Sequence, residues 1–134
     1  MAETARNFVA KGVAHVVLPR VAEPVPVTFI LLPDFTMLAF SSAIEPLRMA
    51  NQLTGQELFR WQVLTEDGKP AACSNGLAVV ADGSWTGTQP EGLIFVVSGV
   101  EPEGKASAAL ADWLRGLWRR GRVVGGLCTG AYAL

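Results

Sequence analysis

Two glycines flank a cysteine near the end of the 134-residue chain, in the order Gly126-x-Cys128-x-Gly130. The continuous apolar run Val123–Leu127 precedes the cysteine, and a helix-forming segment follows it. This order of strand, Gly-x-nucleophile-x-Gly and helix is typical of the nucleophile elbow, a sharp turn that exposes a reactive side chain at the edge of a sheet. Glycines are needed there because neighbouring backbone comes close. The pattern predicts that Cys128 sits in such a turn.

The elbow would make the Cys128 thiol a better nucleophile. The N-terminus of the following helix would lower the pKa of the thiol. The backbone N–H of Thr129, together with that of Gly99 or Val100 after another apolar strand, would form an oxyanion hole. A cysteine hydrolase also needs a base, usually a histidine. The only histidine, His15, lies in the N-terminal stretch, so the residues favour the elbow geometry more than they favour catalytic turnover.

Glu45 has two interpretations that the residues alone leave open. It lies in a predicted helix, on or near the apolar face that carries Ile44, and a carboxyl held near Cys128 could hydrogen-bond the thiol. Alternatively, Ser42-Ala43-Ile44-Glu45 fits the S-x-x-E capping box. Pro46 would then lie close to the start of the helix, where proline is tolerated.

Two further groups of residues favour structural roles. Cys73 precedes the turn sequence Ser74-Asn75-Gly76 and has no charged helix terminus to activate it, so we expect a packing role. Four arginines crowd the end of a predicted helix and could form a nucleic-acid patch, but cations at a helix C-terminus also complement the helix dipole, and we favour the latter. The four are Arg115, Arg119, Arg120 and Arg122.

The apolar pattern predicts the elements that must position these residues. Several strand candidates are continuously apolar rather than alternating, which indicates a parallel sheet buried on both faces. Apolar strands alternating with amphipathic helices indicate an α/β fold with right-handed crossovers. Strands are expected at residues 27–32, 59–65, 77–81, 93–97 and 122–127, and helices at about 38–53 and 105–120, with Gly55 and Gly121 ending the two helices.

Composition bounds the class of protein. Half of the residues are hydrophobic, 17% are charged and the net charge is −1, which favours one globular domain over a disordered tail or a strongly basic nucleic-acid binder. Two cysteines and one histidine exclude a disulfide scaffold and a His-rich metal site, and we expect no metal and no cofactor. Neither a membrane span nor a signal peptide is recognisable, so we expect a cytoplasmic protein. Residues 1–26, rich in proline at their end, are expected to form an arm ahead of the domain.

Several longer motifs carry a family resemblance that covers about residues 27–134. They are IEPLRMAN, WQVLTEDGKP followed by CSNGL, ADGSW, and GGLCTGAYAL. Together they resemble the N-terminal domain of GlxA-type, AraC-family transcriptional regulators. That domain belongs to the ThiJ/PfpI branch of the class I glutamine amidotransferase-like superfamily. The elbow is common to many superfamily members, whereas its combination with EPLRMAN and EDGKP is more specific.

The resemblance implies a fold and a set of site residues. The fold would be a flavodoxin-like three-layer α/β sandwich with a mostly parallel sheet. The helix-one glutamate of the superfamily corresponds to Glu45, which favours the thiol-partner interpretation. The elbow cysteine corresponds to Cys128, with Gly99 and Thr129 at the oxyanion positions.

The resemblance also implies a function. These domains are thought to sense a small metabolite such as an amine or amino acid, while a separate C-terminal helix-turn-helix domain binds DNA. We therefore expect a non-enzymatic sensor of a small-molecule effector. Its ligand-binding residues would be Asp34, Phe35, Glu45, Ser98, Gly99, Cys128 and Thr129. A cationic amine could use the carboxylates and the aromatic face of Phe35. The alternative is a ThiJ/PfpI-type cysteine hydrolase or redox-responsive protein that uses Cys128.

The family domain normally continues past the elbow. Residues 27–134 are therefore expected to form a partial domain that is incomplete at its C-terminus. We expect the helix-turn-helix domain to be absent from this chain. DNA would then be bound only through that absent domain. A partly covered sheet would expose apolar surface, so we expect a homodimer.

Overall fold

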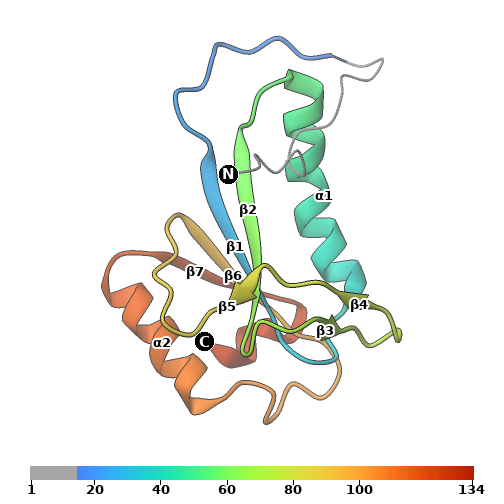
Figure 1. Ribbon diagram of the computed structural model, residues 1–134, viewed down its shortest axis with the longest axis vertical. Coiled ribbons are helices and arrows are strands. Elements are labelled where there is room, and N and C mark those ends of the chain that lie inside the picture. The colour runs from blue at the N-terminus through green and yellow to red at the C-terminus, as the bar shows by residue number, and fades with distance from the viewer. Residues whose placement is uncertain (1–14) are drawn as a thin grey trace.

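The computed structural model describes residues 15–134 and shows a three-layer α/β sandwich (Figure 1). The main sheet has five strands in the order β5-β2-β1-β6-β7, and every pair is parallel. Helices α1 and α2 lie on opposite sides of it. The α/β class, the parallel sheet and the flavodoxin-like layering expected from the sequence are confirmed. The bounds are β1 Val25–Leu31, α1 Met37–Thr54, β2 Phe59–Thr65, β3 Ala71–Ala72, β4 Ala78–Val79, β5 Gly83–Ser84, β6 Leu93–Val97, α2 Ala108–Arg119 and β7 Val123–Leu127.

Two apolar clusters hold the helices on the sheet. On one face, Phe29 of β1 packs edge-on against Phe40 of α1, with ring centroids 5.4 Å apart. On the other face, Ile30 and Ile94 belong to a cluster with Leu114 and its neighbours on α2. Because side chains alternate along a strand, β1 supplies successive residues to both clusters, which explains its uninterrupted apolar run.

The helix termini follow local rules. Gly55 ends α1 in the left-handed conformation with φ 64°, and Gly121, with φ 79°, follows the C-cap of α2. Both glycines were expected at these places. Helix α2 begins three residues later than predicted, because the Ser107 hydroxyl caps it by accepting from the Leu110 N–H.

Three local predictions are wrong. The strand expected at 77–81 is only the two-residue β4, which pairs with β3 outside the main sheet. Strand β5 was not predicted. Pro26, which was expected in the arm of residues 1–26, lies within β1. Pairing with β6 starts only at Val27, so its missing N–H removes no hydrogen bond on that side.

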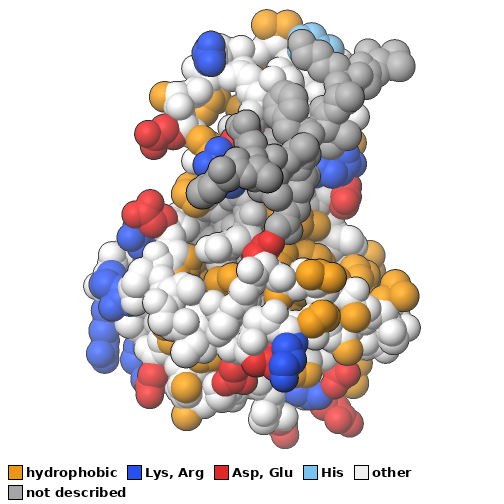
Figure 2. Space-filling view, in the orientation of Figure 1, with side chains coloured by type: hydrophobic (Ala, Val, Ile, Leu, Met, Phe, Trp, Pro, Cys, Tyr) orange, Lys and Arg blue, Asp and Glu red, His pale blue; other side chains and the backbone are white. Residues whose placement is uncertain are grey.

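Basic side chains gather beside α2, while the rest of the visible face carries both charges and exposed apolar groups (Figure 2). Arg115 pairs with Asp112 at 2.5 Å, and Arg122 lies 3.6 Å from Glu91. These contacts fit the expected solvated helix end. No helix in residues 15–134 combines the length and apolarity needed to cross a bilayer.

Candidate functional site

Cys128 occupies a sharp turn between β7 and a short 3-10 helix, Cys128–Ala133. Its φ is 55°, in the left-handed region that non-glycine residues rarely adopt. The flanking glycines are sterically required. A Cβ at Gly126 would lie 2.3 Å from the Ala131 nitrogen, and one at Gly130 would lie 1.9 Å from the Val96 carbonyl oxygen. The elbow geometry therefore exists as the sequence suggests, and its thiol is exposed.

Two side-chain contacts tie the elbow to neighbouring loops. The Cys128 sulfur lies 3.7 Å from the hydroxyl oxygen of Thr36, the residue just before α1. The Thr129 hydroxyl donates to the Gly99 carbonyl oxygen at 2.7 Å. The loops that follow β1, β6 and β7 thus meet at the carboxyl edge of the sheet.

Gly99 is fitted tightly between these loops. A Cβ there would lie 2.5 Å from the Asp34 carbonyl oxygen and 2.7 Å from the Thr36 nitrogen. The Thr36 N–H donates to the Ser98 carbonyl oxygen at 3.3 Å on the same loop. Gly99 and Thr129 are therefore neighbours, and their use as oxyanion donors stays a prediction.

The structure gives Glu45 a role that neither interpretation anticipated. Helix α1 begins at Met37 and contains Pro46, so a capping box at Ser42 is wrong. The Glu45 carboxylate binds Arg48 at 2.6 Å, and its side chain is 53% exposed. Within the described residues it forms no hydrogen bond to Cys128, whose side-chain partner is Thr36 instead.

Two other expected ligand groups are already engaged. Phe35 is 0% exposed and packs edge-on against Phe40. The prediction that its aromatic face contacts a cationic amine is therefore wrong. Asp34, with φ 59°, forms an ion pair with Lys105. Ser98 is buried and its hydroxyl has no hydrogen-bond partner in the described chain. His15 is exposed in the stretch before β1.

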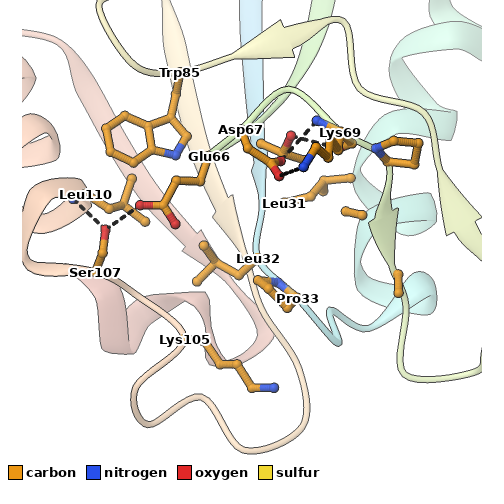
Figure 3. Close-up of a pocket in the computed structure, with 14 residues that line it drawn as sticks. Leu31, Leu32, Pro33, Glu66, Asp67, Lys69, Trp85, Lys105, Ser107 and Leu110 are labelled. Carbon is orange, nitrogen blue, oxygen red and sulfur yellow. Dashed lines mark hydrogen bonds and ion pairs between the residues drawn. The ribbon is translucent and has the colours of Figure 1, made fainter.

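A cavity of about 550 Å³ lies at the same edge of the sheet (Figure 3). It is formed by the ends of β1 and β2 with the segments that follow them, by the residue after β5 and by the start of α2. Lys105 belongs to its lining and, through Asp34, connects it to the elbow loops. The other lining residues are Leu31, Leu32, Pro33, Thr65, Glu66, Asp67, Lys69, Pro70, Ala71, Ala72, Trp85, Ser107 and Leu110.

Known proteins with similar sequences are regulators of transcription. The chain is 45% identical over 106 residues to the HTH-type transcriptional regulator CdhR of Pseudomonas aeruginosa, a match that covers 79% of this chain and 31% of CdhR. It is 36% identical over 107 residues to the HTH-type transcriptional regulator GlxA of Rhizobium meliloti, covering 79% of this chain and 33% of GlxA. This chain is homologous to GlxA-type, AraC-family transcriptional regulators. It spans about a third of the length of these relatives.

Solved structures agree with the sequence matches. An AraC-family transcriptional regulator from Pseudomonas putida superposes with a TM-score of 0.71 at 29% identity, covering 82% of this chain and 68% of that one. A DJ-1 superfamily protein from Agrobacterium tumefaciens superposes with a TM-score of 0.59 at 25% identity, covering 81% and 56%. No protein-family profile matches the chain. The resemblance drawn from the motifs is therefore confirmed.

The sequence did not point to Thr36, Lys105 or Trp85. Thr36 stands between a turn and a helix, an N-cap position that could have marked it, although its side chain makes no cap hydrogen bond. Lys105 and Trp85 are brought to the edge of the sheet only by tertiary packing. Among residues 15–134, no group of three or more His, Cys, Asp or Glu side chains could hold a metal ion.

The two cysteines should react with iodoacetamide at very different rates. Cys128 is exposed, whereas Cys73 is 3% exposed and burial raises the pKa of its thiol. Because the thiolate is the reactive species, we expect native Cys128 to be alkylated on the order of 100-fold faster. Peptide mass spectrometry would measure both rates at pH 7–9. Equal rates in the native protein would contradict this placement, and a guanidinium-unfolded sample provides the control.

Proposed function

We propose that this chain is the effector-sensing domain of a GlxA-type, AraC-family transcriptional regulator. The effector would be a small metabolite of amine or amino-acid type, bound beside Cys128. In the whole protein, a helix-turn-helix domain would contact DNA in the cytoplasm. The names of the homologous regulators support the regulatory role.

The strand order carries the proposal for the site. Helix α1 connects β1 to β2 in one direction across the sheet, and α2 connects β6 to β7 in the other. The connections therefore reverse between β1 and β6, and ligands in open α/β sheets bind at the carboxyl edge of such a switch point. The Thr36–Cys128 and Thr129–Gly99 contacts lie at this edge.

Backbone conformation at the same edge supports a binding role. Asp34 and Cys128 both have positive φ although neither is glycine. Such strained positions cluster at functional sites, where surrounding structure maintains them. In the proposal the amine of the effector competes with Lys105 for the half-exposed Asp34 carboxylate. Glu45 would add negative charge to the effector site. The base of the site would be formed by Ser98, Gly99, Cys128 and Thr129.

A sensor fits the surroundings of the thiol better than a hydrolase does. A nucleophilic cysteine needs a base within hydrogen-bond reach. The hydroxyl of Thr36 occupies that position at 3.7 Å, and Glu45 is paired with Arg48. The homodimer stays a prediction, supported by the exposed side chains of Trp118 and Tyr132.

A thermal-shift screen of amines and amino acids on this chain tests the proposal. An effector at 100 times its dissociation constant should stabilise the fold by about 2.7 kcal/mol and raise the Tm by several degrees. Asp34→Asn should abolish the response, while Asp112→Asn, which removes an exposed carboxylate from α2, should keep it. A screen without any stabilising compound, or an equal response of both variants, would count against the site.

A further inference from the structure

The indole N–H of Trp85 lacks a hydrogen-bond partner in the part of the chain that the structure describes. Trp85 is 4% exposed and its Nε1 is buried. Its neighbour Trp113, whose ring centroid is 5.2 Å away, donates its own N–H to the Thr88 carbonyl oxygen at 3.1 Å. Buried donors are nearly always paired. Trp85 lines the cavity, and Figure 3 shows its nitrogen on the side facing Glu66, so this donor is directed at the cavity.

One carboxylate in the cavity has no cationic partner among the described residues. Asp67 lies 3.5 Å from Lys69, and Lys105 is paired with Asp34. The carboxylate of Glu66 accepts only the Ser107 hydroxyl among these residues, at 3.0 Å. The cavity therefore offers a carboxylate that can still take a cation.

Positive potential and apolar surface complete the lining. The cavity includes Ser107, the N-cap of the twelve-residue helix α2, whose N-terminus carries partial positive charge. Lys105 also lines the cavity, but its charge is offset by the ion pair with Asp34. The side chains of Leu31, Leu32 and Leu110 form an apolar wall.

From these groups we propose that the cavity binds a small zwitterion with an aliphatic side chain. Its ammonium group contacts Glu66, its carboxylate accepts from Trp85 Nε1 beside the start of α2, and its chain packs on the leucines. This site shares no residue with the elbow and does not depend on the proposed regulatory function. It is a second ligand site, distinct from the one beside Cys128.

Nuclear magnetic resonance of the indole N–H groups gives a direct test. The chain has four tryptophans, and Trp85→Phe identifies the Trp85 signal by its disappearance. Titration with L-norleucine should shift that signal saturably. Hexanoate, which lacks the ammonium group, and n-pentylamine, which lacks the carboxylate, should each bind at least ten-fold more weakly, because each satisfies only one of the two groups.

Substitutions in the cavity test its two polar contacts one at a time. Glu66→Gln retains an acceptor for Ser107 but removes the charge, and should weaken norleucine binding at least ten-fold by calorimetry. Trp85→Phe should also weaken it. Two control variants should bind norleucine as the unaltered chain does. Glu91→Gln makes the same change near the start of β6, at the opposite edge of the sheet, and Trp118→Phe changes an exposed tryptophan outside the cavity.

Four results would overturn the inference. The Trp85 signal could fail to saturate, Glu66→Gln could bind norleucine unchanged, or either half-molecule could bind as tightly as norleucine. Shifts confined to the Gly99 and Thr129 amides would also overturn it while supporting the elbow site. Shifts confined to Trp85 would support the cavity and count against the elbow, so the two proposals fail separately.

Discussion

Replacing Gly130 by alanine should cost the fold at least about 3 kcal/mol. The added methyl group would lie 1.9 Å from the carbonyl oxygen of Val96, a fully buried residue of β6. Neither partner is a flexible side chain end, so the elbow must move away from β6. Urea unfolding followed by tryptophan fluorescence should show a much lower midpoint, together with loss of the Thr129–Gly99 contact.

Gly104→Ala is the matched control for this substitution. Gly104 has φ 76° but nothing within 4 Å of its would-be Cβ, so only backbone strain of about 1 kcal/mol is expected. We explain the need for glycine at position 130 by the close packing of the elbow against β6. Equal urea midpoints for the two variants would contradict this explanation.

Asn51→Ala should destabilise the chain by about 3 kcal/mol. Asn51 is fully buried near the end of α1 and holds the start of β2 through three hydrogen bonds. Its Oδ1 accepts the N–H groups of Leu58 and Phe59 at 2.8 and 3.0 Å, and its Nδ2 donates to the Phe59 carbonyl at 2.8 Å. Alanine would remove all three bonds from these half-buried backbone groups, of which the Leu58 N–H keeps one other acceptor, the Gln56 carbonyl oxygen at 3.1 Å. Chemical denaturation would measure the loss.

Asn75→Ala provides the comparison at an exposed turn. There the side chain accepts a single hydrogen bond, from the Leu77 N–H at 3.1 Å, and water can replace it. We expect a loss below about 1 kcal/mol. Similar losses for the two variants would contradict the role of Asn51 as the link between α1 and β2.

Continuous apolar runs and turn residues made most of the fold predictable. The runs at β1, β6 and β7 are long enough to be recognised, and Gly55 and Gly121 mark helix ends. β5 could not be found because Gly83–Ser84 carries no apolar signal and pairs with β2 over only two residues. The elbow was predictable because its Gly-x-Cys-x-Gly motif is local in sequence, although the contact that requires glycine at 130 is a tertiary one with Val96.

The partners of the site residues were less predictable because they depend on tertiary placement. Positive φ at Asp34 turns the chain, and Phe35 then enters the core rather than facing solvent. Glu45 has a cation three residues along its own helix, and this local ion pair forms in place of the expected thiol contact. The donor of Trp85 and the carboxylate of Glu66 meet only when β5 joins β2.

The all-parallel pairing of the main sheet has a kinetic consequence. Val27 of the central strand pairs with Trp61 on one side and with Leu93 on the other. Formation of this sheet cannot begin with a hairpin, because parallel strands are joined by long crossover connections. Closing each connection costs conformational entropy, and strand pairing offsets that cost only after the two strands have met. We therefore expect refolding at rates typical of chains dominated by distant contacts, far slower than those of helical bundles of similar length.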